Sequence, residues 1–175
     1  MRGKPLLALV VMFLALLSAL ATPISKADPA PTATTTDFDA MGSWTDFVHM
    51  DPLFFKSAGI RFESDYVVGW SNGHAALVAN EVWTTPPFTI AATFTRPVTS
   101  VSVSFRMGMQ GTSDYTLVAY SPSGDVIGSD TISLTNNGLD GNFYDVTVSN
   151  LPSKAKSFSI VGAIEYDVKS ITYEY

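Results

Sequence analysis

The sequence predicts an all-β fold, an antiparallel β-sandwich of about eight to ten strands. Short segments rich in β-branched and aromatic residues recur at intervals of about ten residues, and Gly, Pro, Asn, Asp or Ser separates them. The clearest segments alternate apolar and polar residues with the period of two that a strand requires. Only residues 52–59 and 72–82 could be helical, and both are short and lie next to Gly or Pro.

Two consecutive segments are the most regular strand candidates. In PFTIAATFTRP (87–97), every second residue from Phe88 to Phe94 faces one side, and Thr or Ala faces the other. In VTSVSVSFRM (98–107), Val and Phe alternate with Ser and Arg in the same way. Proline at both ends of the first segment fits the end of a strand better than its middle.

The segments 113–120 and 125–134 predict a hairpin. Ser-Pro-Ser-Gly (121–124) joins them, with Pro at the second and Gly at the fourth position of a type I turn. Further strands are predicted at 35–41, 59–64, 66–70, 143–149, 156–162 and 167–175. In the last of these, strict alternation places one set of side chains together, namely Val168, Ser170, Thr172 and Glu174.

The N-terminal residues resemble a secretory signal peptide. Arg2 and Lys4 precede an apolar run of 16 residues, which is shorter than the roughly 20 residues that span a bilayer. We place cleavage after Ala27 rather than after Ala21; an uncleaved anchor is the alternative. The predicted organisation is therefore a signal peptide at 1–27, a Pro/Thr linker at 28–36 and a β-sandwich domain at 37–175, secreted or held at the cell surface, with no membrane insertion after cleavage.

Charge and cysteine content narrow the function. The chain has 16 acidic residues against 10 Lys and Arg, and the basic residues are dispersed along the sequence, so nucleic acid is not an expected partner. There is no cysteine, which excludes disulfides and thiolate chemistry. Two histidines, neither near a nucleophile motif, do not suggest a hydrolase. We therefore expect a protein that is not an enzyme, although two carboxylates facing one cleft would leave a glycosidase open.

The order of these segments resembles a known family. DFDAM, FKSAGIRFES, GWSNGHAALVAN, FTIAATFTRPVTSVSVSF, YTLVAYSPSGDVIGS and FSIVGAIEYDVKSITYEY follow one another as in the jelly-roll, galactose-binding-like domains of bacterial secreted proteins. Such domains are found beside PEP-CTERM sorting tails and are similar in shape to carbohydrate-binding modules. No PEP-CTERM tail follows the last segment, and the paired acids usual in the final strand are reduced to Tyr166-Asp167.

The resemblance implies a structural calcium ion at the edge of the sandwich. The matching ligands are Asp37 or Asp39 near the first strand and Asp167 in the last one. Oxygen ligands from separate chain segments are what calcium prefers, and the ends of such a fold lie together. The alternative is that these carboxylates are solvated residues at strand ends, since no contiguous calcium loop is present.

A glycan or another cell-surface polymer is the expected partner. Aromatic rings stack on the apolar faces of sugars while polar side chains orient the hydroxyl groups. The stretch WSNGHAALVANEVW (70–83) supplies most of the candidates, and Arg106 is a further polar candidate. The predicted ligand-binding residues are Trp70, Asn72, His74, Trp83 and Arg106. The alternative is a structural or adhesive extracellular protein with buried tryptophans that self-associates through a sheet edge, for which the C-terminal TYEY is the candidate.

Overall fold

The computed structural model describes residues 32–41, 48–63, 67–71, 74–78, 86–138 and 141–175. All of them belong to one compact unit, Pro31–Tyr175. The predicted signal peptide and the first residues of the predicted linker lie outside the described residues. Within the described ranges, no helix has both the length and the hydropathy needed to span a membrane.

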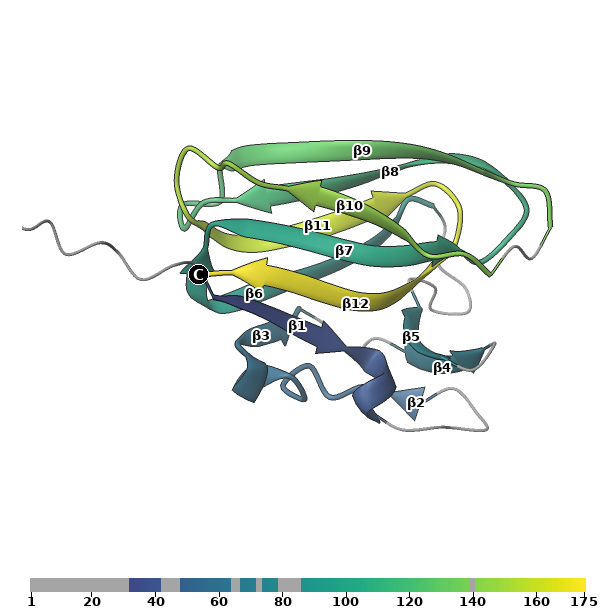
Figure 1. Cartoon of the computed structure of the whole chain (residues 1–175), viewed down its shortest axis with the longest axis horizontal. Helices are drawn as coiled ribbons and strands as arrows, with labels where there is room; N and C mark the ends of the chain where they lie inside the picture. Colours follow the sequence, from purple (N-terminus) through teal and green to yellow (C-terminus); the bar gives the residue numbers. More distant parts are fainter. Residues whose placement is uncertain (1–31, 42–47, 64–66, 72–73, 79–85, 139–140) are drawn as a thin grey trace, which may run out of the picture. The chain divides into compact units, whose positions relative to one another are not determined.

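The fold is an all-β sandwich of two antiparallel sheets, which Figure 1 shows as two layers. The seven-stranded sheet has the order β10-β7-β12-β5-β4-β2, with β1 also paired to β12. Its strands are β1 (Ala33–Asp37), β2 (Val48–His49), β4 (Val67–Ser71), β5 (His74–Val78), β7 (Ser100–Met107), β10 (Tyr144–Val148) and β12 (Tyr166–Glu174). The five-stranded sheet has the order β3-β6-β11-β8-β9. Its strands are β3 (Ile60–Phe62), β6 (Phe88–Val98), β8 (Gly111–Tyr120), β9 (Val126–Asn136) and β11 (Ala155–Gly162).

The predicted fold class is confirmed. The described residues contain twelve strands rather than eight to ten, because short strands such as β2 and β5 were not recognised as strands in the sequence. Alternation placed the core correctly in β6, where Ile90, Ala92 and Phe94 are fully buried. They face the opposite sheet, as do their cross-strand neighbours on β11. Burial of these apolar side chains is the main force that holds a fold without disulfides together.

Strand β12 lies in the interior of its sheet. It pairs with β7 along one side and with β1 and β5 along the other. A β-bulge between Val168 and Ser170 breaks strict alternation, so that Val168 joins Ile171 and Tyr173 in the core. The predicted grouping of Val168 with Ser170 is therefore wrong. The C-terminal TYEY is likewise not a free edge, because Tyr173 is buried between two paired strands.

Two other expectations need correction. The helical candidate at 72–82 contains β5, and the candidate at 52–59 contains only a 3-10 turn, η2 (Lys56–Ala58). Strand β1 begins at Ala33, inside the predicted linker, and a second 3-10 turn, η1 (Phe38–Met41), follows it. The sandwich therefore starts before residue 37, and its first and last strands are neighbours, as the resemblance implied.

Candidate functional site

The described residues of the WSNGHAALVANEVW stretch, 70–71 and 74–78, belong to two paired antiparallel strands, β4 and β5. Trp70 of β4 pairs with Ala75 of β5, and Ser71 pairs with His74. Asn72 and Trp83 lie outside the described residues. The structure therefore places the backbones of Trp70 and His74 on adjacent strands, and the sequence prediction that this stretch binds a ligand stays a prediction.

Arg106 does not lie with Trp70 and His74. It pairs across β7 and β12 with Asp167, and Asp167 pairs in turn with Val78 of β5. His74 is four residues further along β5, so its Cα lies roughly 16 Å from that of Arg106 by ordinary strand spacings. The structure thus separates Arg106 from the two residues with which the sequence grouped it.

Arg106 and Asp167 form a buried ion pair on the outer face of the seven-stranded sheet. Arg106 Nε donates to Asp167 Oδ2 at 3.0 Å, and the two side chains are only 6% and 14% exposed. The ring of Phe143 lies 5.3 Å from the Arg106 guanidinium and 5.3 Å from Lys169 Nζ. Burial raises the pKa of Asp167, and the hydrogen bond and charge of Arg106 oppose that rise. This pair ties β7 to β12, and so little of it is exposed that it offers a ligand almost no surface.

The three predicted calcium ligands do not fit a metal site. Asp167 already has a cationic partner in Arg106, and Asp37 Oδ1 accepts a hydrogen bond from the amide of Asp39 at 2.9 Å. Among the described residues, no group of three or more His, Cys, Asp or Glu side chains could hold an ion together. In the described part of the chain, the three predicted ligands are therefore not brought together as a metal-binding group.

The outer face of the five-stranded sheet carries an aromatic platform that the sequence analysis missed. We call it the Tyr120 face and define it by Tyr120, Val118, Val126, Ser157 and Ser159. Tyr120 pairs with Ser157 on one side and with Val126 on the other, and Val118 pairs with Ser159. All five therefore belong to adjoining positions on β8, β9 and β11.

Tyr120 lies along the sheet instead of standing away from it. Its hydroxyl is 3.0 Å from Ser159 Oγ, and Ser159 is the diagonal neighbour two residues beyond its partner Ser157. Diagonal neighbours in a sheet are about 7–8 Å apart, a distance that the phenol spans only when it lies across the surface. Ser159 is accordingly buried on a face that otherwise points to solvent, whereas the tyrosine remains partly exposed.

Apolar and hydroxyl groups surround this ring. Val126 is 63% exposed, an unusual position for a large apolar side chain on a polar face. Hydroxyl side chains continue the face away from Tyr120 in cross-strand pairs, such as Thr116 with Thr131 at 3.0 Å. Next to the ring, the turn at 121–125 presents Asp125, whose carboxylate accepts a hydrogen bond from Ser123 at 2.6 Å. A partly apolar platform with a polar margin can stack a ring-shaped ligand and orient its hydroxyl groups.

A signal for this face was present in the sequence. Val118 and Tyr120 occupy the polar side of the alternation in β8, and Val126 follows immediately after the turn. Three large apolar residues together on a face of threonine and serine indicate an interaction surface. The prediction rested on tryptophan, whose large ring stacks well on sugars, and it therefore fell on residues 70–83.

No protein-family model and no curated protein sequence matches the chain. Solved structures do. A family 6 carbohydrate-binding module from Clostridium stercorarium, in complex with cellobiose, matches with a TM-score of 0.41 and 13% identity over 80% of this chain and 92% of that chain. A family 36 module in complex with calcium and xylotriose gives 0.33 and 16% identity over 80% and 98%. An arabinose-bound α-L-arabinofuranosidase gives 0.46 and 11% identity over 67% of this chain and 24% of that enzyme.

The matched structures thus include carbohydrate-binding modules, the class that the sequence resembles. The chain spans about a quarter of the arabinofuranosidase, so that match concerns one part of an enzyme. With TM-scores below 0.5, none of these structures assigns a ligand or a reaction to this chain.

Proposed function

We propose that this protein is a non-catalytic glycan-binding module that works outside the cell, and that the Tyr120 face is its binding surface. The observation that supports this most directly is the orientation of Tyr120, whose ring lies along the sheet with its hydroxyl held by Ser159. A ring fixed in this way loses little conformational freedom when a sugar stacks on it.

The composition of the face supports a glycan over an apolar ligand. Tyr120, Val118 and Val126 supply contact area, while hydroxyl side chains lie on the strands on both sides of them. Hydroxyl groups donate and accept hydrogen bonds, as sugar hydroxyls do. A purely apolar ligand would leave these groups without partners and would lose free energy for each one that it buried.

Export and the absence of a reaction are parts of the same proposal. The basic and apolar N-terminal residues support export, since they have the layout of a signal peptide. The buried ion pair of Arg106 and Asp167 is used to hold two strands together, so we assign it no role in catalysis. The adhesive alternative would be favoured instead if the Tyr120 face bound no glycan.

Isothermal titration calorimetry with a panel of soluble glycans tests the proposal. The wild type is expected to bind at least one of them, and Tyr120→Ala to bind it about tenfold more weakly, since a stacked ring contributes about 0.5–1.5 kcal/mol beyond its area. Tyr120→Phe should keep most of the affinity. Met109→Ala removes another exposed apolar side chain, outside the Tyr120 face, and should bind like the wild type. Failure of every glycan to bind, or equal affinity in Tyr120→Ala, would overturn the proposal.

A further inference from the structure

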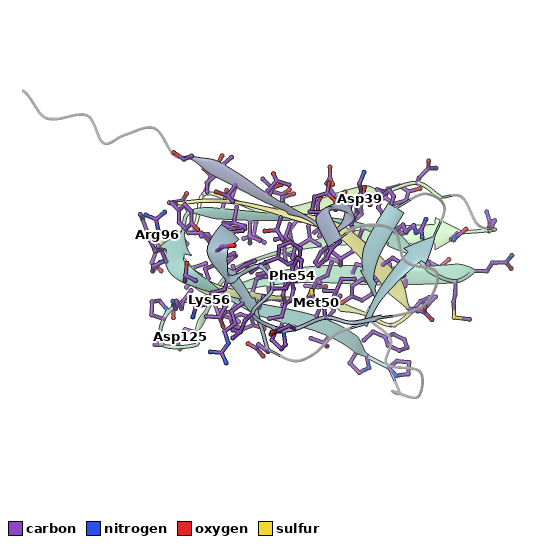
Figure 2. The ribbon with its side chains drawn as sticks, turned by 90° about the horizontal axis from the view of Figure 1, so that it is seen from below. Asp39, Met50, Phe54, Lys56, Arg96 and Asp125 are labelled. Carbon is purple, nitrogen blue, oxygen red and sulfur yellow. The ribbon has the colours of Figure 1, made fainter. Side chains whose placement is uncertain are left out.

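Four of the ten lysine and arginine residues gather at one corner of the sandwich, although they are dispersed in the sequence. We call this group the basic corner; it consists of Lys56, Arg61, Arg96 and Lys156. Two backbone hydrogen bonds hold the segments of Lys56 and Arg96 together. Thr95 N donates to Gly59 O at 2.8 Å, and Gly59 N donates to Lys56 O at 3.1 Å. Lys56 and Arg96 accordingly lie at the same end of the ribbon in Figure 2.

The other two cations, Lys156 and Arg61, lie on strands that pair with β6. Lys156 Nζ lies 2.5 Å from Phe94 O and 3.3 Å from Thr95 O, where β11 bulges against β6. Arg61 is the central residue of β3 and pairs with Thr93 of β6. Its side chain is exposed, and among the described residues none forms a hydrogen bond or an ion pair with its guanidinium. Arg61 is therefore a cation available to a ligand.

One cross-strand row joins the basic corner to the Tyr120 face. Arg61 pairs with Thr93, Thr93 with Ser157, and Ser157 with Tyr120, so all four residues belong to one outer face. Three strand spacings separate Arg61 from Tyr120, or about 14 Å. The two residues between them, Thr93 and Ser157, are small and carry hydroxyl groups. A ligand extended across the strands would pass from an aromatic platform to an exposed guanidinium.

From this row we infer that the Tyr120 face selects acidic glycans, in which a uronic acid carboxylate reaches Arg61 while another sugar stacks on Tyr120. The inference rests on the proposed function. A guanidinium can hold a carboxylate through two parallel hydrogen bonds, a pairing that a neutral sugar cannot make. The cations lie at the end of the row where the ligand's carboxylate would bind, whereas Asp125 lies at the Tyr120 end, where the neutral sugar would stack.

The acidic net charge of the chain does not oppose this binding. Charges more than about 8 Å away are largely screened at physiological salt, so acidic residues elsewhere on the chain act only weakly on a ligand at Arg61. One acidic residue lies close by, since Glu63 is two residues from Arg61 and is also exposed. Glu63 should weaken the attraction for a carboxylate, and that makes it a useful site for a matched variant.

The test compares acidic glycans with the same glycans whose carboxyl groups are neutralised as methyl esters. Oligogalacturonate and glucuronate-branched xylo-oligosaccharides are each titrated beside their methyl esters, at low and at physiological salt. In at least one pair, the acid should bind about tenfold more tightly than its neutral counterpart, the effect expected of one charge-assisted pair. The preference should fall as salt rises. Arg61→Gln should remove most of the preference, and Glu63→Gln should increase it.

The outcomes separate this inference from the proposed function. Equal binding of acid and neutral forms, with affinity still dependent on Tyr120, would overturn the acidic preference and leave glycan binding intact. A preference for acids that persists in Arg61→Gln would also overturn it. If no member of either pair bound, and no other glycan did, both the proposed function and this inference would fail.

Discussion

Tyr115 packs flat against a glycine in the middle of the core. A Cβ added at Gly162 would lie 2.5 Å from Tyr115 Cδ1, and Tyr115 cannot retreat because its ring packs on Phe105 and Tyr166 at 4.8 and 5.4 Å. We predict that Gly162→Ala lowers the free energy of unfolding by about 1–3 kcal/mol, the usual cost of overpacking. Urea unfolding measures this. Gly138→Ala is the control, because a Cβ there meets nothing within 4 Å; equal losses in the two variants would contradict the prediction.

The raised pKa of Asp167 should make the stability of the folded chain depend on pH. Burial raises its pKa above the ordinary 3.8, so in the range just above 3.8 the folded chain holds this proton more tightly than the unfolded chain. The stability that it contributes is complete below 3.8 and is lost as the pH rises through the folded-state pKa. The free energy of unfolding of the wild type, minus that of Asp167→Asn, should therefore fall as the pH rises.

Urea unfolding between about pH 3.5 and 6.5, a range that brackets ordinary and raised carboxyl pKa values, measures this difference. Asp145→Asn removes an exposed carboxyl group from the neighbouring strand β10 and is the control for general charge effects. A difference that rises with pH would show that attraction to Arg106 outweighs burial.

Among the elements, β9 shows how the sandwich protects an edge. Asp130 pairs with Leu117, so it occupies a core-facing register position on an edge strand, and its Oδ2 accepts a hydrogen bond from Thr147 N of β10 at 3.4 Å. Charges that point inward from an edge strand discourage pairing with a second chain. Asp130→Val should therefore increase self-association, as measured by analytical ultracentrifugation. Ser129→Val, at an outward position of the same strand, should stay closer to the wild type; if both variants remain monomeric, Asp130 is not protecting the edge.

The elements also show what the sequence could and could not predict. Alternation located β6 and β7 and the core side of each, and the Pro-Gly turn located the β8–β9 hairpin, where Gly124 N donates to Ser121 O at 3.0 Å. Such patterns are local. The bulge in β12 depends on its pairing with β7, and the position of Arg106 beside Asp167 depends on strands 61 residues apart. The Tyr120 face likewise combines three strands, so its polar margin could not be read from one of them.

In the whole molecule, the outer faces of the two sheets are expected to have different roles, one in stability and the other in ligand binding. The seven-stranded sheet places a charged pair under Phe143 and uses it to join β7 to β12. The five-stranded sheet keeps its aromatic ring and one guanidinium accessible, at the two ends of a row of hydroxyl side chains. Ligand binding is therefore expected on one face, and stability should respond mainly to changes in the core and on the other.

The N-terminal boundary gives a prediction about the whole domain. β1 pairs with β12 from Ala33 to Asp37, so a domain cut at residue 37 or later loses this strand. A chain that starts at residue 31 should match a chain that starts at residue 28 in urea unfolding, since Pro31–Tyr175 is one compact unit. A chain that starts at Phe38 should lose about 2–4 kcal/mol of stability, because several ladder hydrogen bonds disappear and Thr36 no longer covers the core. It should also self-associate, since removing β1 opens part of the edge of β12 to another strand. Equal stability and a monomeric state for both chains would show that β1 contributes nothing to the sandwich, and the boundary at residue 37 would then stand.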